Sequence, residues 1–245
     1  MSFTFHDKSH RYFLDGKPLT GVTTILSVIA KPALVGWAAR MATERVAELW
    51  EPEREYKEEE IKSILDDAVN AHKRKKEKAA EQGTDIHSWI EDLIKASIGN
   101  TPKPDLPTDE IAREQAEQFI QWEQRNNVRW LESEKKMYSR KHWIAGTCDA
   151  VAIIDGKKYV VDIKTMAKIW DRTPFLQMAG YRLMLEEMGE KEFEGSLVLL
   201  LPKGGTMEEK YSYDLEGDMR GFTSALELYR TLGAYDPDTH KKLKK

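Results

Sequence analysis

The sequence is poor in cysteine, because Cys148 is the only one among its 245 residues. One thiol cannot form an internal disulfide, a four-cysteine zinc site or a cysteine-ligated iron–sulfur cluster. No apolar run approaches the roughly 20 residues that a membrane-spanning helix needs. The first residues, MSFTFHDKSHRYF, lack the hydrophobic segment of a secretory signal. We therefore expect a cytoplasmic protein that does not enter a membrane.

An excess of positive charge is also missing. The chain carries 38 Lys and Arg against 42 Asp and Glu, which gives a formal net charge of −4. A domain that binds nucleic acid through its overall charge is strongly basic, so any contact with DNA must use a local basic surface. The composition, 33% charged and 40% hydrophobic, predicts a globular protein with long solvated helices.

The chain changes character near residue 130, from helical patterns to alternating strands and helices. Residues 2–19 predict a β-hairpin with Asp15-Gly16 as a turn signal. The sequence predicts helices beginning near residue 20 and over 33–49, 84–95, 109–126, 173–188 and 217–232, and strands within 130–165, 196–201 and 210–215. This order predicts an α/β fold with a mixed central sheet flanked by helices. We expect a single domain over 1–245, divided into an N-terminal hairpin and helical region (1–82), a core (83–235) and a basic tail (236–245).

The most informative segment is a predicted hairpin that carries two aspartates. If Asp155 and Gly156 form a two-residue turn, Asp149 lies directly opposite Asp162 in the sheet, and Lys164 points to the same face. A turn shifted by one residue pairs Asp149 with Lys164 instead and keeps the same face. A three-residue loop would break this arrangement.

Two carboxylates facing each other in a sheet repel. At about 5 Å the cost is roughly 3 kcal/mol at an effective dielectric constant near 20. A divalent cation would turn the repulsion into attraction, and oxygen ligands on strands suit Mg²⁺ or Mn²⁺. Lys164 beside such a site could orient a water for metal-assisted hydrolysis of a phosphodiester. The alternative is a surface hairpin whose Asp and Lys form a salt bridge.

Four motifs stand in the chain in a specific order. They are Gly83-Thr-Asp-Ile-His87, Gly146-x-x-Asp149, Asp162-Ile-Lys164 and Gln177-Met-Ala-Gly-Tyr181. Together they resemble the PD-(D/E)XK nuclease superfamily, in its RecB-like branch. The segment Thr20–Leu26, followed by Leu34-Val-Gly-Trp37, is similar to the front of phage-type exonucleases and of the mitochondrial genome maintenance exonuclease. The resemblance implies a restriction-endonuclease-like core.

The resemblance also implies roles for individual residues. Asp149 and Asp162 would be metal ligands, joined by the backbone carbonyl of Ile163, and Lys164 would be the catalytic lysine. His87 would be a further ligand that reaches in from its helix, and its alternative is an ordinary, partly buried histidine. These roles make Mg²⁺ or Mn²⁺ the expected cofactor.

Four further side chains lie near these motifs, and their roles stay open. Gln177 and Tyr181 share a helix face that, in the family, contacts DNA and the edge of the active site, or they form a polar pair on an amphipathic helix. Glu134 would support a second metal, or it is one of many solvated glutamates. Glu91 shares a helix face with His87 and could orient it.

Two features of related proteins are missing. Some RecB-like relatives carry four cysteines for an iron–sulfur cluster, and this chain has one. There is no Walker A motif either, because Gly204-Gly205 is a turn after a strand, so the sequence predicts no ATP-driven unwinding.

Three patches could contact DNA or be ordinary surface and core. The basic run 72–78 could grip phosphates or be a solvated helix face. Arg140, Lys141 and His142 could contact phosphates or end a strand. Trp37, Trp50, Trp89, Trp143 and Trp170 could stack on bases or pack in the protein.

The resemblance implies a Mg²⁺- or Mn²⁺-dependent exonuclease that hydrolyses single-stranded or duplex DNA ends. The expected setting is recombination, repair or genome maintenance in a bacterium or a phage-infected cell, with a single-strand annealing or binding protein as a partner. The alternatives are a structure-specific endonuclease on the same core and a non-catalytic DNA-binding protein. Polarity, strand preference and oligomeric state stay open.

Overall fold

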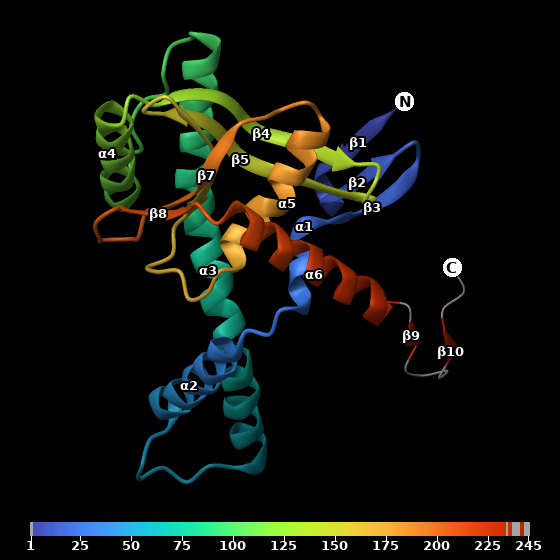
Figure 1. Cartoon of the computed structure of the whole chain (residues 1–245). Coiled ribbons are helices and arrows are strands. Elements are labelled where there is room, and N and C mark those ends of the chain that lie inside the picture. The colour runs from blue at the N-terminus through green and yellow to red at the C-terminus, as the bar shows by residue number, and fades with distance from the viewer. Residues whose placement is uncertain (1, 234, 237–240, 243–245) are drawn as a thin grey trace. The chain divides into compact units, whose positions relative to one another are not determined.

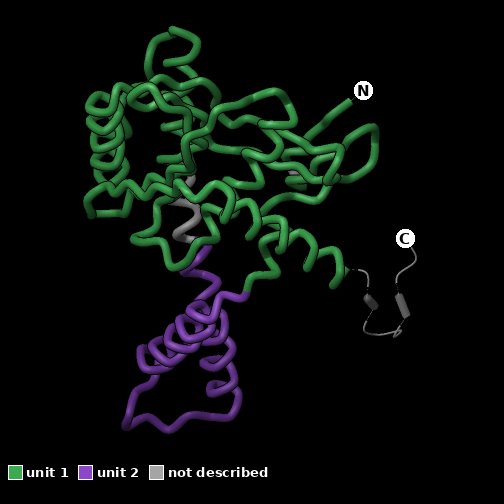
Figure 2. Tube along the Cα trace, in the orientation of Figure 1, with its two compact units in different colours: residues 1–29, 86–245 green, residues 30–85 purple. Residues whose placement is uncertain are grey.

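The structure, a computed structural model, describes residues 2–233, 235–236 and 241–242. It divides into two compact units, residues 1–29 with 86–245 and residues 30–85 (Figure 2). The first unit contains the sheet and most helices, and the second contains α2 and the first part of α3. The N-terminal strands thus belong to the same unit as the predicted core.

After residue 129, strands and helices alternate as the sequence pattern predicts (Figure 1). The strands are β1 (Phe3–His6), β2 (Arg11–Leu14), β3 (Lys17–Gly21), β4 (Arg129–Ser139), β5 (Ile144–Ile154), β6 (Lys157–Lys164), β7 (Phe193–Leu200), β8 (Glu208–Ser212), β9 (Tyr235–Asp236) and β10 (Lys241–Lys242). The helices are η1 (Asp7–Ser9), α1 (Val22–Ile25), η2 (Leu26–Val28), α2 (Pro32–Leu49), α3 (Glu58–Gly99), α4 (Glu110–Arg125), α5 (Thr173–Glu187) and α6 (Leu215–Gly233).

The central sheet is mixed, which confirms the predicted fold class. Its strand order is β1-β2-β3-β5-β6-β7-β8, and β4 pairs with β5. β3 runs parallel to β5 and β6 runs parallel to β7, whereas the other neighbours are antiparallel. The parallel β6–β7 pair needs a crossover, and α5 supplies it.

Helices cover both faces of this sheet, so its central strands are apolar on both sides. On one face, α1, α5 and α6 pack on β5 and β7 through residues such as Ile25, Met184 and Phe222. On the other face, α4 and the part of α3 that begins at Ile86 pack through side chains such as Phe119. Burial on both faces explains the long apolar runs of β5 and β7.

Three predictions from the sequence need correction. The N-terminal segment is a three-stranded meander and not one hairpin, because Asp15-Gly16 joins β2 to β3 and η1 joins β1 to β2. The predicted helix 84–95 is part of the longer α3, because the charged segment before it holds no residue that stops a helix. Thr173-Pro174 at the start of this helix predicts Thr173 as the N-cap of α5, but the N-cap is Arg172. In the predicted basic tail, β9 pairs with β10, and residues 237–240 and 243–245 lie outside the described residues.

The second unit pairs α2 with the first part of α3 mainly through charge. Asp67 binds Arg45, and its second oxygen lies 3.0 Å from Arg74 Nη2. In the basic run, His72 lies edge-on against Trp37 with 6.3 Å between ring centroids. The side chains of Lys73, Lys75 and Lys76 are exposed, and that of Lys78 lies outside the described residues. In the described part of the chain, no single helix combines the length and the hydropathy needed to cross a membrane.

Candidate active site

The hairpin between β5 and β6 confirms the predicted register. Asp155 and Gly156 have φ of 47° and 82°, the left-handed conformation that a two-residue hairpin turn requires. Ile154 pairs with Lys157, and the ladder continues to Ala150 and Val161. It ends there, one step before the predicted pair of Asp149 and Asp162. The two aspartates therefore flank the point where the strands separate.

This separation is a fork in the sheet. One edge of β5 pairs with β6 over Ala150–Ile154 and with β3 over Ile144–Ala145. Asp149 lies in the stretch between these two pairings, and its Oδ2 accepts a hydrogen bond of 2.7 Å from the backbone N–H of Ile163. A carboxylate thus replaces the backbone acceptor where the ladder opens. Asp149 is held in place by the strand that carries Asp162.

Asp162 is buried, with 1% of its surface exposed, and only half of its carboxylate is satisfied. Lys164 Nζ donates to Oδ1 at 2.6 Å, whereas Oδ2 has no hydrogen-bond partner among the described residues. Burial raises the pKa of Asp162, Lys164 opposes this, and the charge of Asp149 raises the pKa further. A buried oxygen without a donor costs free energy.

Glu134 lies near Asp149, and its role, which the sequence left undecided, stays a prediction. It lies in β4 between the ladder pairs Ser133–Ala150 and Lys135–Cys148, across from Asp149. Its φ of 47° is left-handed, which is strained for a non-glycine residue inside a strand. Burial first, and then the charges of Asp149 and Glu91, raise the pKa of Glu134 to about 7. Nothing in the sequence indicates this conformation, and the register of the β4–β5 ladder is the same on both sides of Glu134.

The helix that carries His87 approaches this carboxylate cluster. Ile86 and Ile90 are buried against the sheet, and His87 is half-buried. Glu91 accepts a hydrogen bond from Lys95, and its charge acts on Glu134. Among the described residues, no three His, Cys, Asp or Glu side chains stand close enough to share a metal ion. The ligand role of His87 therefore stays a prediction, and the side chains of 83–85 in the same motif lie outside the described residues.

The predicted pair on α5 does form. Gln177 Nε2 donates to the hydroxyl oxygen of Tyr181 at 2.8 Å. Burial first, and then the charge of Asp162, raise the pKa of Tyr181, so its ring lies beside the cluster. An added Cβ on Gly146 would stand 2.6 Å from Tyr181 Cε1. The glycine of the Gly146-x-x-Asp149 motif is therefore needed so that this ring can pack on β5.

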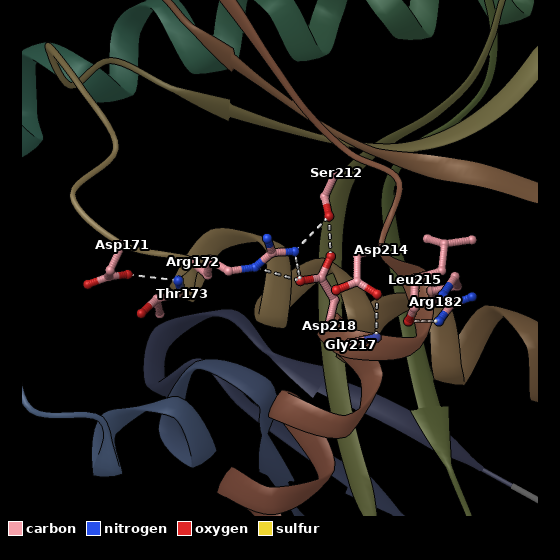
Figure 3. Close-up of polar contacts among 9 residues, drawn as sticks. All are labelled: Asp171, Arg172, Thr173, Arg182, Ser212, Asp214, Leu215, Gly217 and Asp218. Atoms are coloured by element: carbon pink, nitrogen blue, oxygen red, sulfur yellow. Dashed lines mark hydrogen bonds and ion pairs between the residues drawn. The ribbon is translucent and has the colours of Figure 1, made fainter.

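A second acidic cluster fixes the segment between Lys164 and α5 (Figure 3). Asp218, on the first turn of α6, has its Oδ1 bound by Arg172 Nη2 at 2.6 Å, and its Oδ2 accepts from the hydroxyl of Ser212. Arg172 also donates to Ser212 Oγ at 3.0 Å. The cluster joins the start of α5, the end of β8 and the start of α6. No local sequence pattern predicts this cluster, because Arg172 and Asp218 are far apart in the chain.

The other candidate patches are mostly structural. Trp89 donates from Nε1 to the carbonyl of Asp105 at 2.7 Å, and Trp143 donates to that of Pro18 at 3.0 Å. Trp170 is 71% exposed, with Lys168 Nζ 3.8 Å from its ring centroid. The remaining candidates also have local contacts, since Arg140 Nη2 lies 3.2 Å from Asp15, His142 Nε2 lies 3.8 Å from Glu187, and Trp50 stacks on Tyr56.

Comparisons with known proteins give structural likeness without sequence likeness. No protein-family model and no curated protein matches the chain. Among solved structures, the chain is similar to a candidate exonuclease from Eubacterium rectale, with 12% identity, a TM-score of 0.43 and coverage of 66% of this chain and 76% of that chain. It is also similar to a phage-related exonuclease from Haemophilus somnus 129PT, with 12% identity, a TM-score of 0.30 and coverage of 60% and 82%.

Proposed function

We propose that this protein is a divalent-metal-dependent exonuclease that hydrolyses phosphodiester bonds at DNA ends, with a PD-(D/E)XK site. The observation that carries the proposal is the half-satisfied carboxylate of Asp162. It is buried beside Lys164 and within electrostatic range of Asp149. A purely structural ion pair would have both carboxylate oxygens satisfied.

The donor set suits Mg²⁺ or Mn²⁺. Asp162 Oδ2 is a buried acceptor that has no partner among the described residues. Asp149 is close enough for its charge to raise the pKa of Asp162 and that of Glu134. Asp149 and Asp162 would hold the ion together with the carbonyl of Ile163. Glu134 and His87 would have to move closer to act as further ligands, because no three such side chains among the described residues stand close enough to share one ion. Hard oxygen ligands on strands are typical of sites for these ions. The bound ion would supply positive charge that polarises the phosphodiester.

The side chains around the ion have separate tasks. Lys164 keeps Asp162 charged in a buried setting and can donate a hydrogen bond to the attacking water or to the phosphate. Asp149, fixed by the N–H of Ile163, holds its orientation without rearrangement. Gln177 and Tyr181 form the wall against which the phosphate lies, with Gly146 leaving room for the ring.

The direct test compares three substrates under three metal conditions. Linear single-stranded DNA and linear duplex, both end-labelled, and closed circular DNA are incubated with Mg²⁺, Mn²⁺ or EDTA. We expect loss of the linear substrates with metal only and intact circles, because an exonuclease requires an end. The position of the retained label then gives the polarity.

Two other results would replace the proposal. Nicked or linearised circles would indicate the endonuclease. Metal-independent DNA binding without cleavage in any reaction, with folded protein, would indicate the non-catalytic binding protein.

A further inference from the structure

A cavity of about 650 Å³ lies between the N-terminal strands and the middle of β4. Three parts of the first unit line it. They are β1 and β2 with η1, the last turns of α3, and β4 with β5. Its lining residues include Phe5, His10, Tyr12, Lys95, Glu134 and Lys136.

One wall of the cavity is aromatic and firmly held. The rings of Phe5 and Tyr12 lie 4.7 Å apart between centroids, and His10 lies 5.9 Å from Phe5. The hydroxyl of Tyr12 shares a hydrogen bond of 2.8 Å with Thr147 Oγ1 on β5. This bond ties the wall to the strand that carries Asp149, two residues further along. The rings are therefore fixed relative to the candidate active site.

The rim of the cavity carries both signs of charge, because three lysines (Lys95, Lys135 and Lys136) and three carboxylates (Asp7, Glu91 and Glu134) line it. Lys136 Nζ lies 4.6 Å from the ring centroid of Phe5 and 4.0 Å from Asp7 Oδ1. Lys95 is bound by Glu91 on the same helix. The ammonium of Lys136 covers the ring face of Phe5, so a ligand that stacks there must displace it. A flat ligand on the ring would move the ammonium toward the ligand's own negative charge.

The floor of the cavity includes Glu134, which the charge of Asp149 influences. A ligand in the cavity therefore lies next to the proposed site of phosphodiester hydrolysis. Its volume lies within the range of roughly 300–1,000 Å³ that holds small ligands. A space of this size takes one or two nucleotides and not a stretch of duplex.

We propose that this cavity binds one unstacked base of a DNA single strand, next to the phosphate that is cleaved. The base stacks on Phe5 and Tyr12, and Lys136 and Lys95 contact the neighbouring phosphates. Bases within a duplex are already stacked on both faces, so the cavity favours single-stranded ends. This inference rests on the proposed nuclease function and adds the strand preference and the residues that set it.

The test asks whether removal of one base from the DNA weakens binding in the same way as removal of the Phe5 ring. Fluorescein-labelled thymidine oligonucleotides, each with one abasic position, are bound to wild type, Phe5→Leu and Phe5→Trp in EDTA, and affinity is read from anisotropy. Phe13→Leu is the matched control, because Phe13 follows Tyr12 in β2, points to the opposite face and packs on His6 at 4.7 Å. Circular dichroism and thermal melts check that every variant is folded.

We expect one abasic position to weaken wild-type binding by about tenfold. Phe5→Leu should weaken binding of the intact oligonucleotide by a similar factor and be insensitive to that position, whereas Phe5→Trp and Phe13→Leu should behave like wild type. Equal sensitivity of wild type and Phe5→Leu at every position would overturn the inference. If metal-dependent cleavage persists in that case, the nuclease stands and only the base site fails. If wild type neither binds nor cleaves DNA, both proposals fail.

Discussion

Asp162 and Asp218 are both buried aspartates paired with a basic side chain, and they differ in how completely they are bonded. Asp218 has both oxygens bound, by Arg172 and by Ser212, as Figure 3 shows. Asp162 has one oxygen bound by Lys164, and its other oxygen has no partner among the described residues. Burial is the same for the two, at 1% exposure.

The difference is the one expected between a carboxylate that only stabilises the fold and one that binds a ligand. A buried carboxylate that only stabilises the fold gains from every hydrogen bond it can make. Asp218 follows this rule and joins three segments. Asp162 departs from it in the same region where Glu134 holds a strained backbone and Asp149 uses its side chain in place of a strand partner. Unsatisfied and strained groups gathered at one fork in the sheet are typical of a ligand site.

The largest expected effect is on catalysis. Asp162→Asn should reduce metal-dependent cleavage of labelled DNA by roughly 1,000-fold or more, because the amide cannot balance the charge of a cation. Asp218→Asn should keep cleavage per folded molecule within about threefold of wild type, because that side chain touches no part of the site. Equal loss in the two variants would remove the distinction drawn between them.

Lys164→Ala should abolish cleavage as well, while a far-ultraviolet circular dichroism spectrum shows that the fold is retained. Its ammonium is the one hydrogen-bond donor that the structure gives to Asp162. Full activity in this variant would contradict the role assigned to the lysine.

Asp218→Ala should act on stability instead. We expect the free energy of unfolding to fall by about 3 kcal/mol in urea denaturation, because charge-assisted hydrogen bonds are lost and Ser212 keeps a buried hydroxyl. The conservative Ser212→Ala should cost less, about 1 kcal/mol. An unchanged unfolding midpoint for Asp218→Ala would show that the cluster does not anchor α6.

Gly146→Ala tests the packing beside Asp162. The new methyl would stand 2.6 Å from Tyr181 Cε1, so the ring must move or the strand must shift. We expect a loss of about 2 kcal/mol in stability and a fall in cleavage larger than the stability loss explains. Gly156→Ala, at a turn with φ of 82°, is the matched control for stability loss away from the site. Wild-type cleavage by folded Gly146→Ala would show that the position of Tyr181 is unimportant.

The smallest effect depends on pH and concerns Glu134. Its pKa rises from 4.5 to about 7 in the folded protein, so ionisation of Glu134 costs stability increasingly between these pH values and fully above them. Glu134→Gln should therefore stabilise the metal-free protein above pH 7 by roughly 1 kcal/mol, discounted for partial exposure, and the gain should disappear near pH 4. Thermal melts in EDTA at several pH values measure this.

The control for Glu134 is Glu132→Gln on the same strand. Glu132 forms an ion pair with Lys135, so its replacement should not stabilise the protein at any pH. A gain for Glu132→Gln equal to that for Glu134→Gln would indicate a general effect of negative charge.

Local sequence signals predicted much of this arrangement. Asp155-Gly156 predicted a two-residue turn, and the turn set the register as far as Ala150 and Val161. The alternation of the strands put Asp162 and Lys164 on one face, and their contact confirms it. These features could be predicted because they depend on residues close together in the chain.

The remaining features depend on distant parts of the chain. The fork arises because β3 pairs with the start of β5, and the left-handed Glu134 lies on β4 opposite the fork. Asp218 and its two partners, Arg172 and Ser212, come from three separate segments. No local pattern encodes such contacts, so the sequence predicted which residues matter but not which oxygen of Asp162 stays free.

The most direct measurement is a calorimetric titration of Mn²⁺ into the wild type, Asp162→Asn and Asp218→Asn at one pH. The account predicts that wild type and Asp218→Asn bind Mn²⁺ with similar affinity and that Asp162→Asn loses binding by at least tenfold. Unchanged Mn²⁺ affinity in folded Asp162→Asn would contradict the claim that the free oxygen of Asp162 is a metal ligand.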